Sequence, residues 1–69
     1  MDVVSVFGSL AGKVWKALSE GEKTFTQIQK STGLSVKEVG IGLGWLAREG
    51  KISIIGNPDK LYHKFKLNE

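Results

Sequence analysis

The chain has 69 residues, and its ten Lys or Arg against seven Asp or Glu give a formal net charge of +3. A chain this short forms one domain with a small core. It has no cysteine, which excludes disulfides, thiolate metal sites and a thiol nucleophile, and its N-terminus lacks the basic cluster of an export signal. We therefore expect one cytoplasmic domain over residues 1–69, without a membrane span.

The first predicted element is an amphipathic helix over about residues 3–19. Apolar residues recur there at the spacings of three and four that place them on one helix face. They are Val3, Phe7, Leu10, Val14 and Leu18. Gly21 follows the last of them, and glycine at this place is a common helix stop. The apolar face spans roughly half of the circumference, so it is wide enough to pack on two sides.

Two capping-box signatures predict the next two helices. Thr24 and Gln27 have the spacing at which a hydroxyl and an amide satisfy each other's backbone donors, so a helix should run over about residues 25–32. Gly33 then supplies a tight turn. Ser35 and Glu38 repeat the signature and predict a helix over about residues 36–49. Two short helices around a glycine turn are typical of a helix-turn-helix.

The third helix has a competing interpretation, because residues 39–45 alternate apolar side chains with glycines, as a strand does. The capping box before this stretch and the helix formers Leu46 and Ala47 after it favour a helix. Each interior glycine should cost about 1 kcal/mol relative to alanine, so we expect a weak helix. Gly40 and Gly44 share one row, where they are expected to let a neighbouring helix approach closely.

The C-terminal part reads as a β-hairpin over about residues 51–67. Residues 51–55 are rich in β-formers, residues 56–60 are turn formers, and residues 61–67 alternate. Leu61, His63, Phe65 and Leu67 share the strand face that should pack. The whole order of elements predicts an α+β fold of the winged helix-turn-helix type, with three helices followed by a two-stranded β-hairpin wing.

Two stretches of the sequence resemble a known protein family. The run from Leu43 to Ile52, with Ala11 to Trp15 upstream, resembles the small prokaryotic winged helix-turn-helix domains of unknown function. The resemblance covers nearly the whole chain. It implies the winged-helix fold and binding to nucleic acid or protein, and it implies no substrate and no catalytic residue.

Catalytic and metal-binding residues are sparse in this sequence. His63 is the single histidine, and the carboxylates are scattered, so the ligands of a metal site and the partners of an acid–base pair are lacking. We expect a protein that is not an enzyme and that uses no cofactor. His63 is interpreted as a packed or edge residue of the wing rather than a pH switch.

The outer face of the third helix suggests a protein partner. At about 100° per residue its buried face should consist of Val39, Leu43, Leu46 and Ala47. Ile41 and Trp45 then lie nearly opposite and should be exposed, with Lys37 and Arg48 at the rim. Such a composition resembles an interface hot spot more than a base-reading surface. The alternative is that Trp45 folds back against the wing or the first helix.

The charges give the second hypothesis. Residues 1–35, 36–49 and 50–69 contribute one, zero and two positive charges, so the basic excess leans toward the wing. Lys51, Lys60, Lys64 and Lys66 are candidates for phosphate contacts, which would bind nucleic acid weakly and without sequence preference. Exposed lysines on a strand also serve to protect a hairpin edge from aggregation.

Three functions therefore remain open at the level of sequence. We favour a stand-alone binding module for another protein, with Lys37, Ile41, Trp45 and Arg48 as its interface. The first alternative is a transcription-related domain that contacts nucleic acid phosphates through its basic wing. The second is a homodimer that forms through the wide face of the first helix or through the patch around Ile41 and Trp45.

Overall fold

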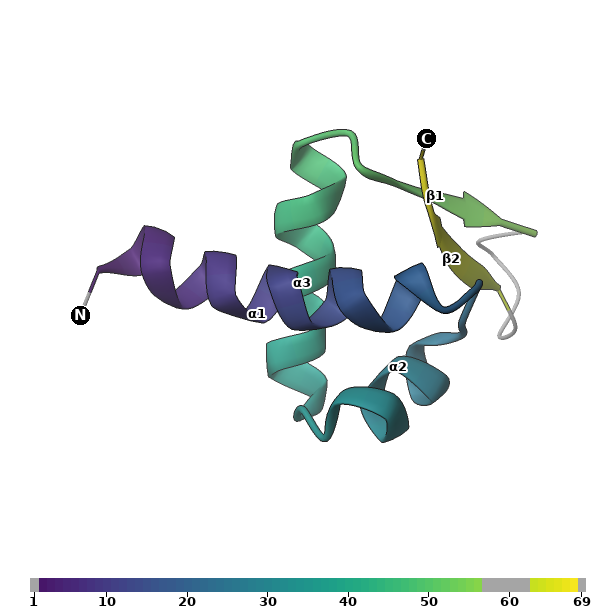
Figure 1. Ribbon diagram of the computed structural model, residues 1–69, viewed down its shortest axis with the longest axis horizontal. Helices are drawn as coiled ribbons and strands as arrows, with labels where there is room; N and C mark the ends of the chain where they lie inside the picture. Colours follow the sequence, from purple (N-terminus) through teal and green to yellow (C-terminus); the bar gives the residue numbers. More distant parts are fainter. Residues whose placement is uncertain (1, 57–62, 69) are drawn as a thin grey trace.

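The computed structural model describes residues 2–56 and 63–68. Three helices come first, α1 (Val3–Ser19), α2 (Phe25–Thr32) and α3 (Val36–Arg48). Two strands follow, β1 (Ile52–Ile55) and β2 (Lys64–Leu67), which pair antiparallel with Ile52 opposite Leu67 and Ile55 opposite Lys64. This is the predicted α+β winged helix-turn-helix fold. Figure 1 shows α1 crossing α3, with α2 beside the crossing and the two strands at the C-terminal end of α1.

The helix ends are fixed by the caps that the sequence predicted. The Thr24 hydroxyl accepts from the Gln27 amide at 3.2 Å, and the Gln27 side chain accepts from the Thr24 amide at 2.8 Å. Ser35 and Glu38 make the same reciprocal pair at 3.1 and 2.9 Å. Gly33 ends α2 in the left-handed conformation, at φ 73°. Because both boxes are complete, α3 begins at a defined residue despite its glycines.

The core lies between the three helices and is closed by the wing. Val14 of α1, Ile28 of α2 and Val39 of α3 are fully buried, and Phe65 of β2 packs against the same cluster. The N-terminal end of α1 projects beyond this core (Figure 1), and Val3 and Val4 there are each 60% exposed. Across the described residues, no helix has both the length and the apolar character needed to cross a membrane.

The wing is attached to the helices by backbone hydrogen bonds. The Lys51 amide donates to the Leu46 carbonyl of α3 at 2.9 Å, and the Asn68 amide donates to the Lys51 carbonyl at 2.8 Å. On its other side β2 pairs with the segment before α2, because Lys23 and Phe65 exchange two bonds of 3.1 and 2.8 Å. These bonds make β2 the middle strand and leave β1 at the edge.

Candidate protein-interaction surface

Gly42 lies where α1 and α3 cross, and it is buried. A Cβ atom at this position would lie 2.7 Å from Val14 Cγ2 and 3.0 Å from the Leu10 backbone oxygen, both on α1. Only glycine therefore fits this crossing without a shift of one helix. The expectation that Gly40 and Gly44 serve this purpose is wrong, because both are exposed and a Cβ atom at either would meet nothing within 4 Å.

The crossing at Gly42 also fixes the rotation of α3 about its own axis. The buried residues of α3 are Val39, Gly42, Leu43 and Leu46, whereas Ala47, which was expected among them, is exposed. At 100° per residue the buried face is thus turned by roughly 40° from the expected one, toward the side that carries Trp45.

Ile41 and Trp45 are consequently half-buried, and the expectation that they are exposed is wrong. The Trp45 ring meets the Phe7 ring of α1 edge to face, with the centroids 6.0 Å apart and the planes at 89°, and it packs against the core. The alternative in which Trp45 folds back against the first helix is confirmed. A tryptophan that already packs in this way is a structural residue of the α1–α3 contact.

The exposed strip of α3 has a different composition from the one predicted. It consists of Val36, Lys37, Gly40, Gly44, Ala47 and Arg48. Lys37 and Arg48 are therefore exposed as expected. Among the described residues the single ion pair joins Lys23 and Glu20 at 3.6 Å, so neither of these two cations is paired with a carboxylate there.

The charges of α3 are separated around its axis. At 100° per residue Lys37 and Arg48 lie within about 20° of each other, while Glu38 and Glu49 lie about 100° away. Two hydrogen bonds, from the Ser35 amide and then the Ser35 hydroxyl, lower the pKa of Glu38, and Lys13 of α1 acts in the same direction. The carboxylates of α3 thus lie toward α1, and the exposed strip keeps the two cations.

An apolar groove of about 600 Å³ lies between the exposed strip of α3 and the wing. Gly40, Gly44 and Ala47 form its α3 side, and Ile52 and Ile54 of β1 form its wing side. It is also lined by Phe25, Leu43, Ser53 and Phe65. Figure 1 shows the chain turning at the C-terminal end of α3 and β1 running away from that helix. We call this groove the α3–wing groove.

Two further properties of the α3–wing groove concern its exposure and its charge. Ile54 at its rim is 50% exposed, which is costly for a chain that has so few core residues. Among the described residues no acidic side chain lines it, and the exposed strip beside it carries Lys37 and Arg48. Sequence reasoning missed this surface, although the row of Gly40, Gly44 and Ala47 was a signal that no bulky side chain covers this face of α3.

The lysines proposed for phosphate contact do not join this surface. Lys51, Lys64 and Lys66 are exposed, and Lys60 lies outside the described residues. Residues directly opposite in the hairpin share a face, so Lys64 lies with Ile55 and away from Phe65 and the groove. The His63 ring packs against Phe65 with the centroids 5.2 Å apart, as expected for a packed wing residue.

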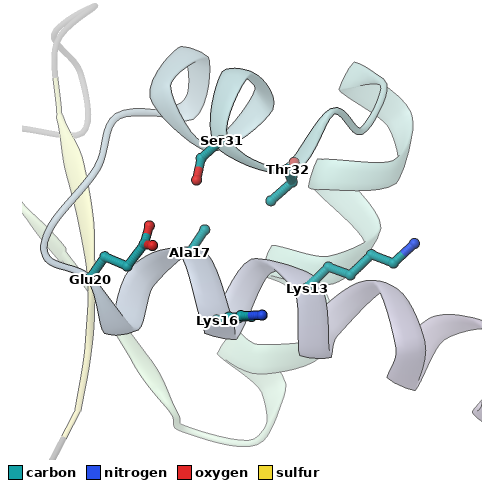
Figure 2. A pocket seen from close by; sticks show the side chains of 6 residues that line it. All are labelled: Lys13, Lys16, Ala17, Glu20, Ser31 and Thr32. Atoms are coloured by element: carbon teal, nitrogen blue, oxygen red, sulfur yellow. The ribbon is translucent and has the colours of Figure 1, made fainter.

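A second hollow of about 310 Å³ lies between α1 and α2, and it is lined by Lys13, Lys16, Ala17, Glu20, Ser31 and Thr32. In Figure 2 the Lys13 amino group extends away from Ser31, whereas the Glu20 carboxylate lies on the opposite side of the hollow. The charged groups therefore do not converge on one point. Within the described ranges no three His, Asp or Glu side chains gather as metal ligands would.

Comparison with known proteins agrees with this geometry. The family model described as a winged helix-turn-helix domain (DUF2582) matches residues 1–64. A protein of Methanocaldococcus jannaschii, named Uncharacterized protein MJ1608, is 37% identical over 68 residues, which cover 94% of this chain and 97% of that protein. The three helices and the antiparallel wing of the structure fit that description. The chain therefore belongs to the DUF2582 family of winged helix-turn-helix domains.

Proposed function

We propose that this winged helix is a protein-interaction module and that the α3–wing groove is its binding surface. The observation that supports the proposal is the composition of the exposed strip of α3. A DNA-reading winged helix inserts this strip into the major groove and offers several long polar side chains to the base edges. Here Gly40, Gly44 and Ala47 occupy the middle of the strip, next to the apolar side chains of β1, and only Lys37 and Arg48 are long polar side chains.

The test is a comparison of two glycine variants. Gly44→Gln places a polar chain over the floor of the α3–wing groove, and Gly12→Gln makes the same change on α1. Both positions are exposed and helical, and a Cβ atom at either meets nothing within 4 Å, so both variants should fold. The wild type and both variants are coupled to a resin, and the proteins that each captures from a lysate of the source organism are quantified by mass spectrometry.

The proposal expects one or more proteins that the wild type and Gly12→Gln capture equally and that Gly44→Gln captures at least about tenfold less, as blocking a hot spot would do. Equal capture by all three, or no protein enriched over bare resin, contradicts it. Thermal unfolding of both variants shows that any loss comes from the surface and not from the fold.

Nucleic acid binding is the second candidate, and the exposed Lys51, Lys64 and Lys66 are the observation in its favour. Phosphate contacts alone would give binding that weakens steeply with salt. We expect no binding of random duplex DNA at about 50 mM salt in a fluorescence anisotropy titration. Binding at that salt which Gly44→Gln leaves unchanged and a Lys64→Ala, Lys66→Ala double variant removes would favour this candidate instead.

A further inference from the structure

The outer edge of β1 presents backbone groups that no described residue pairs. Phe65 of β2 exchanges its hydrogen bonds with Lys23, so its amide and carbonyl point away from β1. Phe65 is opposite Ile54, and the pairs of an antiparallel ladder alternate between bonded and non-bonded. Ile54 is therefore a non-bonded position toward β2, and so is Ile52, two residues earlier. The amides and carbonyls of both point outward, to the open edge.

Natural proteins usually protect such an edge with a charge, a proline or a bulge. The four residues of β1 are Ile52, Ser53, Ile54 and Ile55, which include none of these devices. Lys64 and Lys66 lie on β2 instead, and that strand is already paired on both sides. The sequence suggested that lysines protect the hairpin edge from aggregation. These lysines do not lie on β1, which is the strand with the exposed edge.

The open edge and the α3–wing groove are two sides of one site. Ile52 and Ile54 line the groove with their side chains and face the edge with their backbone. A strand added at about 4.8 Å from β1 would direct every second side chain to the face that carries the groove. Hydrogen bonds would supply affinity, and the apolar groove would select those side chains.

The charges near the site favour acidic residues at the two ends of such a strand. Lys37 and Arg48 lie on the exposed strip beside Gly40 and Gly44, and neither has a carboxylate partner among the described residues. Glu38 and Glu49 lie on the other side of α3. Acidic residues beside the apolar positions of a bound segment would complement these two cations.

Resting on the proposed function, we infer that the partner's segment binds as an additional β-strand on β1. It pairs with the backbone of Ile52 and Ile54, places apolar side chains in the α3–wing groove and carries acidic residues at its ends. A second copy of this chain fits the site less well. A two-fold interface places the same patch on both subunits, so each copy would bring its own Lys37 and Arg48 and no acid to pair with them.

The probe is a synthetic peptide of alternating valine and threonine between paired aspartates, DDVTVTVDD, added to the isotopically labelled full chain. Backbone amide exchange is followed by NMR. Without peptide, the amides of Ile52 and Ile54 should exchange freely. The amides of Ser53 and Ile55 point toward β2 and should be protected. At saturation with peptide, exchange at Ile52 and Ile54 should slow by at least about tenfold.

Two control peptides isolate the features of the probe. DDVTPTVDD cannot donate its central backbone hydrogen bond, and KKVTVTVKK reverses the charge. Each should bind at least about tenfold more weakly than the probe. Equal binding of the lysine peptide would overturn the acidic specificity, and failure of the probe to bind at all would overturn the proposal.

Two variants test the edge itself. Ile54→Pro removes an amide that points away from β2, so the hairpin keeps its ladder and proline is tolerated there. Ile54→Val keeps the amide. The proline variant should lose about tenfold in affinity for the probe, and the valine variant should retain it. If Ile54→Pro unfolds the chain, the exchange pattern of the wild type with the three peptides decides alone.

Failure of this inference differs from failure of the proposed function. Suppose that Gly44→Gln loses partner capture and that the peptide changes the NMR chemical shifts of groove residues, while the amides of Ile52 and Ile54 still exchange freely. The proposed function would then stand, and strand addition would be overturned. Protection of both amides without peptide, together with a dimer mass in sedimentation, would assign the edge to a second copy. Protection by duplex DNA would assign it to nucleic acid. Either result overturns the inference.

Discussion

Replacing Gly44 by alanine should raise the free energy of unfolding by about 1 kcal/mol, because the position is helical and exposed and its new methyl group meets nothing within 4 Å. For a domain of this size that corresponds to a rise in Tm of about 4–8 °C. Gly40→Ala should behave alike for the same reason. Both changes affect only the intrinsic stability of α3.

Gly42→Ala starts from the same gain in helix propensity but should not stabilise the protein. Its methyl group would lie 2.7 Å from Val14 Cγ2 and 3.0 Å from a backbone oxygen of Leu10, which cannot rotate away. Val14 is fully buried, so α1 itself has to shift, and overpacking of this kind costs about 1–3 kcal/mol. The net change should lie between about zero and 2 kcal/mol of destabilisation.

Guanidinium unfolding followed by far-UV circular dichroism measures all three variants on one scale. The difference between Gly44→Ala and Gly42→Ala should be about 1–3 kcal/mol. If Gly42→Ala is as stable as Gly44→Ala, α1 and α3 do not cross closely at Gly42. The rotation of α3 that exposes the α3–wing groove would then be wrong as well.

Three further variants test other parts of the structure. Trp45→Ala should destabilise the fold by about 2–4 kcal/mol in thermal unfolding, since the ring packs against Phe7 and the core, and an unchanged Tm would restore Trp45 as an exposed anchor. Gly33→Ala should cost about 1 kcal/mol in the same assay, because it forces a side chain at φ 73°, and no loss would show that α2 does not end in the left-handed turn. For Glu38, the lowered pKa means that its carboxylate stabilises the folded state above its ordinary titration range, and that this contribution is lost as the pH falls through the folded pKa. The wild type should therefore exceed Glu38→Gln in Tm at neutral pH by more than at about pH 3, and a difference that does not change with pH would contradict this.

The order of elements could be predicted because its signals are local in sequence. The pair Thr24 and Gln27 and the pair Ser35 and Glu38 each satisfy backbone donors within three residues, so no tertiary information is needed to place the helix starts. Gly33 and the alternation in the wing are equally local. Even the alternating glycines of residues 39–45 did not obscure α3, because its caps lie outside that stretch.

The α3–wing groove could not be predicted because it depends on how α3 is rotated. A helical wheel weighs residues by hydrophobicity, and Gly42 adds almost none, so the wheel placed Ala47 in the core and Trp45 outside. The close approach of Leu10 and Val14 to Gly42 decided otherwise. The open edge of β1 was hidden for a similar reason, since the pairing of Phe65 with Lys23 joins residues far apart in the sequence.

The ratio of partner capture by Gly44→Gln and by Gly12→Gln tests the central claim most directly. Both variants carry the same side chain on an exposed helical glycine, and only Gly44 lines the α3–wing groove. A protein-interaction module that uses this groove predicts a ratio at or below about one tenth for the partner captured by the wild type. A ratio near one would contradict the claim and place the binding surface elsewhere on the domain.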